Sequence, residues 1–69
     1  MTLNVFIDQY TRVSQILDNT ERDESIPRIK RDGMAIVADE WLRSLIKQAN
    51  RKQLDWIHEN YPMDEYRYR

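Results

Sequence analysis

Residues 3–18 read LNVFIDQYTRVSQILD, and this stretch decides the fold. Its main apolar residues recur alternately three and four positions apart, which is the spacing that keeps one face of a helix turned toward a partner helix. The row consists of Leu3, Phe6, Tyr10, Val13 and Leu17. We therefore predict a helix over 3–18 that carries a coiled-coil seam. We also expect this row to form an interface with a second copy of the chain or with another protein.

The residues after this helix include a loop, a helix-starting proline and a helix-ending glycine. Segment 19–25 is polar and is predicted to be a solvated loop. Pro27 fixes its own φ and lacks an N–H, so it suits the first turn of a short helix over 27–32. Gly33 then suits the left-handed position that commonly ends a helix. The sequence thus predicts a second, short helix that stops at this glycine.

A β-hairpin over 26–38 is the alternative for the same segment. In that arrangement the two strands pair across a turn at Asp32 and Gly33, and the β-branched Ile36 and Val37 favour strand geometry. We prefer the helical version because the chain has one glycine and is otherwise rich in helix formers. The fold class predicted is all-α, a small helical hairpin or three-helix domain, with α+β as the alternative.

The third predicted helix is long and begins at residue 34 or 39. Seven apolar residues of this segment fall within an arc of about 160° when placed at 100° per residue, which is the width of a core-facing stripe. They are Trp41, Leu42, Leu45, Ile46, Ala49, Trp56 and Ile57. We expect one unbroken helix through Asn50 to about residue 60, packed antiparallel against the first helix. Ile36 and Val37 lie off the arc and need another cover.

Composition limits the class of protein. A chain of 69 residues is too short for two independent cores, so we expect one domain over residues 1–61 and a C-terminal tail over 62–69. No apolar run is long enough to cross a bilayer, and the chain contains no cysteine, so a cytoplasmic setting is expected. The net charge of −1 provides no overall attraction to nucleic acid or anionic membranes.

No catalytic constellation is evident. His58 is the single histidine, and neither neighbouring carboxylates nor any cysteine complete a metal-ligand set around it. One glycine cannot build a phosphate-binding loop or a nucleophile elbow. We therefore predict no catalytic residue, no cofactor and no metal ligand, and we expect a protein that is not an enzyme.

A basic row is the strongest polar candidate. Arg43, Lys47 and Arg51 follow one another at intervals of four on the predicted long helix, where like charges repel slightly. This row could contact an acidic protein surface or phosphates, although we prefer a solvated face as its explanation. The tail offers a second polar candidate with alternating rings and guanidinium groups. It is expected to be either frayed or a strap that packs Met63 and Tyr66 back on the helices. Its residues are Tyr66, Arg67, Tyr68 and Arg69.

The function expected from these features is binding. Two helices can cover only one side of each other, so apolar surface at Ile7, Ile36, Val37 and Trp41 predicts a homodimer or an obligate protein partner. We expect a small adaptor, regulator or inhibitor that occupies a surface on a larger protein. Its size is compatible with an accessory protein of a phage or mobile element that blocks a host machine. The alternative is a nucleic-acid-binding accessory protein that uses the basic row.

Overall fold

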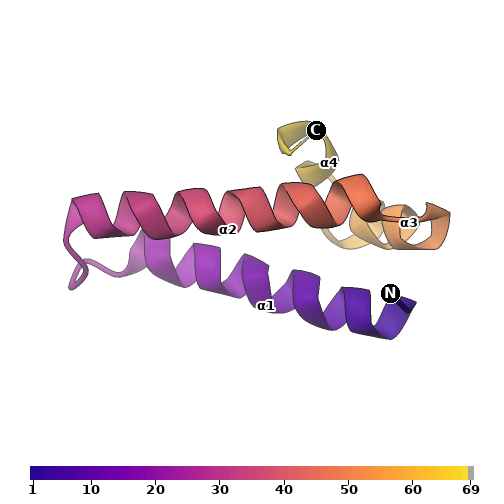
Figure 1. The fold of residues 1–69 in the computed structure, drawn as a ribbon, viewed down its shortest axis with the longest axis horizontal. Helices are drawn as coiled ribbons and strands as arrows, with labels where there is room; N and C mark the ends of the chain where they lie inside the picture. The colour runs from indigo at the N-terminus through magenta and orange to yellow at the C-terminus, as the bar shows by residue number, and fades with distance from the viewer. Residues whose placement is uncertain (69) are drawn as a thin grey trace.

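The computed structural model describes residues 1–68, which form four helices and no strand (Figure 1). The helices are α1 (Leu3–Arg22), α2 (Arg28–Gln48), α3 (Arg51–Asn60) and α4 (Asp64–Arg67). α1 and α2 run antiparallel side by side, while α3 and α4 turn back along the pair. The all-α prediction is confirmed, and the α+β alternative is wrong because residues 28–38 are helical.

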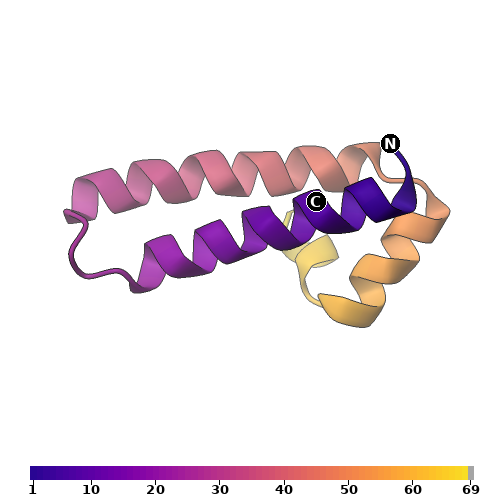
Figure 2. The same ribbon diagram turned by 90° about the horizontal axis from the view of Figure 1, so that it is seen from below.

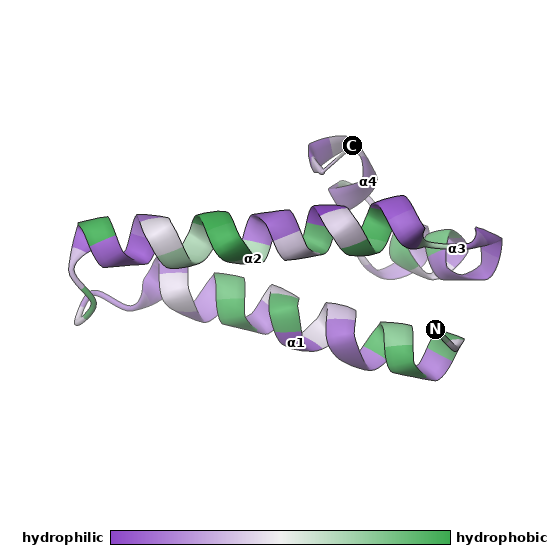
Figure 3. Ribbon diagram, in the orientation of Figure 1, coloured by the Kyte–Doolittle hydropathy of each residue, from purple (hydrophilic) through white to green (hydrophobic). Residues whose placement is uncertain are grey.

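The core lies where α1 meets α2. Four of the five residues in the predicted row are almost completely buried there, at most 5 % exposed, while Leu3 is 37 % exposed. The buried members are Phe6, Tyr10, Val13 and Leu17, and they form one cluster with Ala38, Leu42, Leu45 and Ile46 of α2. Figure 3 shows apolar segments recurring along both helices. The predicted seam is thus closed within the chain by α2, and not by a second copy.

α1 is longer than predicted. It begins after Thr2, whose side chain accepts a hydrogen bond from the Val5 N–H, and it continues to Arg22 instead of ending at residue 18. Thr20 is buried, and packing of this last turn against α2 outweighs the weak helix propensity of the polar residues. The connecting loop therefore starts only at Asp23, whose carboxylate accepts hydrogen bonds from Ser25.

α2 is one continuous helix where we predicted a stop. Pro27 lies at the N-cap with φ −55° and ψ 142°, just outside the helix. Gly33 is inside α2, its φ is not positive, and a Cβ built on it would contact nothing within 4 Å. The predicted helix end at this residue is wrong because α2 continues through it to Gln48. The backbone there does not require a glycine. The short helix over 27–32 is the first part of α2.

The predicted unbroken helix to residue 60 is interrupted at Ala49 and Asn50, which both adopt extended ψ angles. Asn50 starts α3 with a capping box: its side chain accepts from the Gln53 N–H at 3.0 Å, and the Gln53 side chain accepts from the Asn50 N–H at 2.9 Å. The buried Gln53 amide also donates to the Met1 carbonyl at 3.0 Å. This network redirects the chain so that α3 folds back toward α1.

Replacing Asn50 with alanine is expected to lower the free energy of unfolding by about 1 kcal/mol, because the first turn of α3 loses its side-chain acceptor. Aspartate at this position keeps an acceptor and serves as the control. The measurement is urea denaturation followed by circular dichroism. Equal midpoints for the alanine and aspartate variants would contradict the capping role.

α3 and α4 lie on one side of the α1–α2 pair, and no other element of residues 1–68 lies on the opposite side (Figure 2). This asymmetry follows from the turn at Asn50, because a continuous helix would have projected beyond the pair. The pair therefore has one face closed by the rest of the chain and one face left open.

Candidate protein-docking face

The open face of the pair is apolar. Five large side chains of α1 and α2, each between 43 and 63 % exposed, define what we call the open face. They are Val5, Ile16, Met34, Val37 and Trp41. Val5 and Ile16 are eleven residues apart, which at 100° per residue places them within about 20° of each other around α1. α1 and α2 thus each contribute a row to one surface.

A groove of about 300 Å³ runs between the two rows. Val13 and Ala38, both buried in the core, also line it, so the groove reaches the base of the hairpin packing. The remaining lining residues are Ile16, Gly33, Met34, Val37 and Trp41, and none of the seven is charged. The absence of a side chain at Gly33 leaves the groove open at that position.

The α2 row has the spacing of a helix that docks into a groove. Met34, Val37 and Trp41 stand at positions i, i+3 and i+7, which places all three on one stripe of the helix. Trp41 is about half exposed although it is among the largest apolar side chains of the chain. Tryptophan is enriched among the residues that contribute most to protein interfaces. The α2 row therefore combines docking geometry with a strong anchor.

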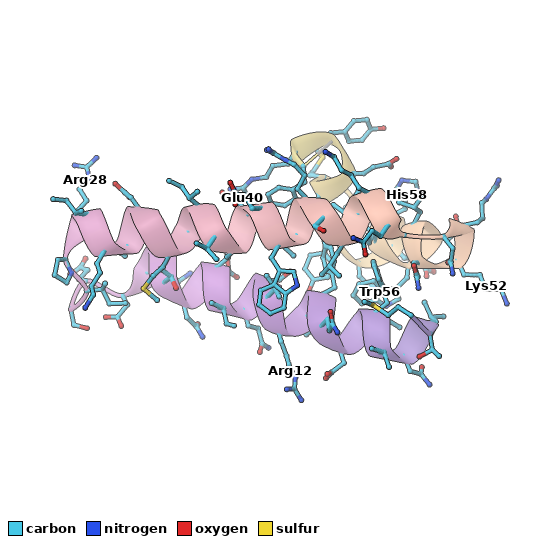
Figure 4. The ribbon with its side chains drawn as sticks, in the orientation of Figure 1. Arg12, Arg28, Glu40, Lys52, Trp56 and His58 are labelled. Atoms are coloured by element: carbon cyan, nitrogen blue, oxygen red, sulfur yellow. The ribbon has the colours of Figure 1, made fainter. Side chains whose placement is uncertain are left out.

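Charged side chains lie at the outer edges of the hairpin. In Figure 4, Arg12 projects outward from α1 and Glu40 from the opposite outer edge of α2. Arg12 forms an exposed ion pair with Asp8 at 3.1 Å. Such a pair contributes little to stability, since solvent screens it. The groove between these edges is uncharged, so its attraction for a partner is hydrophobic.

The closed face is sealed by aromatic rings. Tyr10 of α1 lies at the centre, with ring centroids 5.8 Å from Phe6, 5.7 Å from Trp56 and 5.1 Å from Tyr61. The contact with Trp56 is edge to face, an arrangement that aromatic quadrupoles favour. The two tryptophans, predicted on one side of a single helix, therefore lie on different helices: Trp56 packs against the closed face and Trp41 lies on the open one.

Two tyrosine–carboxylate contacts fasten α4 over the closed face. The Tyr10 hydroxyl donates to the Asp64 carboxylate at 2.6 Å, and Tyr68 is buried beside the Asp39 carboxylate of α2. Burial, followed by interaction with these carboxylates, raises the pKa of both tyrosines far above the ordinary value. Residues 64–68 are therefore docked as a strap through Asp64 and Tyr68, and not through Met63 and Tyr66 as predicted, which are 70 and 72 % exposed.

The polar candidates from the sequence are divided by the structure. Arg43 and Lys47 are exposed on α2, but Arg51 belongs to α3, so the predicted continuous row of three is broken. In the tail, Tyr66 and Arg67 are exposed, whereas Tyr68 is buried and has the Arg67 guanidinium 5.3 Å from its ring centroid. Arg69 lies outside the described residues.

The predicted apolar interface residues also separate. Val37 and Trp41 line the groove, whereas Ile36 is exposed but points about 100° away from its neighbour and does not line it. Ile16 and Met34 were not among the predicted interface residues. The spacing of three and seven from Met34 to Val37 and Trp41 was the signal that could have identified Met34.

His58 of α3 pairs with Glu65 of α4 on the surface away from the groove. Residues 1–68 contain no group of three or more histidine and acidic side chains arranged to hold a metal ion. No helix within these residues has the length and apolar character required to span a membrane. Comparison with protein-family models, curated proteins and solved structures finds no match for this chain.

Proposed function

We propose that the protein is a non-enzymatic protein-interaction module that docks an apolar helix of another polypeptide on its open face. The observation that carries this proposal is the pairing of a half-exposed Trp41 with an uncharged groove on a hairpin whose other side is sealed. Exposed apolar patches bordered by polar residues are typical of protein interaction sites. The i, i+3, i+7 spacing of the α2 row is the spacing with which a helix packs one apolar stripe against a partner.

Size and shape indicate what such binding achieves. The chain is 69 residues long and has dimensions of 38 × 21 × 18 Å, and the hairpin of α1 and α2 extends along its longest axis (Figure 1). A module of this kind acts by covering a surface on a larger protein, as an adaptor, regulator or inhibitor. An accessory protein of a phage or mobile element that blocks a host machine fits this description.

A pair of adjacent substitutions tests the proposal. Val37→Glu places a charge in the groove, and Ile36→Glu places the same charge at a similarly exposed position outside it, at 63 and 59 % exposure respectively. A desolvated charge costs several kcal/mol, so we expect Val37→Glu to abolish partner binding while Ile36→Glu retains it. The measurement is quantitative co-purification of bound protein with the three tagged chains at low and high salt.

The salt series separates the two candidate classes of partner. Hydrophobic docking persists at high salt, whereas nucleic-acid binding through Arg43 and Lys47 weakens steeply with salt. Loss of binding in Val37→Glu alone, at both salt concentrations, supports the proposal. Equal retention by both variants, or capture of nucleic acid that salt removes, would contradict it.

A further inference from the structure

We propose that, in the absence of another partner, the open face is occupied by the open face of a second copy of this chain, related by a two-fold axis. The inference rests on the proposed function, because it names an occupant for the same surface. It goes further because it makes the protein a homodimer when no other partner is bound. Three features of the open face favour a second copy: its shape, its charge and its area.

The shape is self-complementary. A two-fold interface brings the same patch of both partners together, so each patch must offer both a ridge and a groove. On the open face the same side chains do both, since Met34, Val37 and Trp41 project from α2 and also line the groove beside it. A second copy can therefore insert its α2 row into the groove while its own groove receives the first copy's row.

The charge of the face does not oppose this pairing. None of the seven residues that line the groove is charged, so two copies bring no like charges together at the centre of the contact. The whole chain has a net charge of only −1, and repulsion between two copies is correspondingly small. A like-charge pair at the centre of an interface would have cost several kcal/mol.

The area of the face suits a dimer. The five side chains are each about half exposed, and an aromatic side chain such as Trp41 buries roughly 150–250 Å² when fully covered, so together they leave on the order of 400 Å² of apolar surface. A standard interface takes about 800 Å² from each partner, of which rather more than half is non-polar. The apolar part of the open face therefore has the size that one partner of a stable dimer supplies.

The chain contains no cysteine, so a single introduced thiol reports on one position. Val37→Cys places the thiol in the groove, and Ile36→Cys places it on the neighbouring, similarly exposed position outside the groove. The probe is the rate of alkylation by iodoacetamide, measured on the full chain at low and at high micromolar protein concentration. Both thiols should react at comparable rates in dilute protein.

At high protein concentration we expect alkylation of Val37→Cys to slow by about tenfold or more, because burial against a second copy removes access to the thiol, while the rate for Ile36→Cys stays unchanged. Unchanged rates for both thiols would overturn the inference, as would equal slowing of both, which places the contact elsewhere. If the rates stay unchanged but Val37→Glu alone loses its protein partner, only the second copy is excluded and the proposed function stands.

Discussion

Replacing Leu45 with glutamate is expected to unfold the protein. Leu45 is 4 % exposed and belongs to the cluster that joins α1 to α2. A carboxylate buried there without a partner costs several kcal/mol, or it is neutralised at a similar cost through a raised pKa. A single core in a chain this small rarely supplies more than about 3–5 kcal/mol. The expected result is loss of the cooperative thermal transition in circular dichroism.

Lys47→Glu is the matched control for this experiment. Lys47 is exposed on the same helix two residues later, and it lies on the side of α2 away from the core. We expect this variant to melt within a few degrees of the wild-type chain, because surface substitutions usually change stability by less than about 0.5 kcal/mol. Similar melting of the two variants would contradict the packing of α2 described above.

The second large effect is expected at Tyr10. Tyr10→Ala removes the ring at the centre of the aromatic cluster and should lower the free energy of unfolding by about 3–5 kcal/mol, the range for large aromatic truncations in cores. Tyr10→Phe keeps the ring and removes the hydrogen bond to Asp64, for which about 1.5–3 kcal/mol is expected. Urea denaturation measures the loss in Tyr10→Phe. Tyr10→Ala is expected to show no cooperative transition, because its loss equals the roughly 3–5 kcal/mol that a core of this size supplies. Equal stability of wild type and Tyr10→Phe would show that the bond to Asp64 does not fasten α4.

The same hydroxyl predicts a dependence on alkaline pH. The pKa of Tyr10 is raised in the folded chain, so its contribution to stability is fully present below the unfolded value of about 10 and is lost as the pH rises above it. Tyr68 adds a loss in the same direction. We therefore expect stability to fall above about pH 10, and to fall less steeply in Tyr10→Phe.

Periodicity predicted the parts of the fold that depend on repeated apolar spacing. The row from Leu3 to Leu17 identified the buried face of α1, and the pattern from Leu42 to Ile46 identified the facing side of α2. These predictions succeeded because burial of one stripe provides most of the stability of a surface helix in a small domain.

The errors arose where a local signal competed with packing or capping. Gly33 is a common helix-ending residue, yet here it continues the helix because its neighbours on α2 pack against α1. Asn50 followed three residues later by Gln53 is a helix-start pattern, but the surrounding apolar arc suggested continuity. That single turn decides which side of the hairpin is sealed, so the position of the open face could not follow from periodicity.

The candidate site was predicted in part for the same reason. Val37 lay off the predicted core arc and is 63 % exposed beside the groove, and Trp41 was a predicted interface residue that also lines the groove. Ile36 also lay off the predicted core arc, but it lies outside the groove. The difference depends on the direction of α2 relative to α1 and α3, which a pattern along one helix does not contain.

The most direct test of the central claim is the molar mass of the wild-type and Val37→Glu chains in solution, determined by light scattering coupled to size exclusion over a wide range of concentration. The claim is that the open face is an association surface. It predicts a wild-type mass that rises toward twice the chain mass of 8.5 kDa and a Val37→Glu mass that stays at 8.5 kDa. A dimer that forms equally well in both chains would contradict the claim, because the charge would then lie outside the contact. A wild-type chain that stays at 8.5 kDa throughout would show that the open face does not take a second copy.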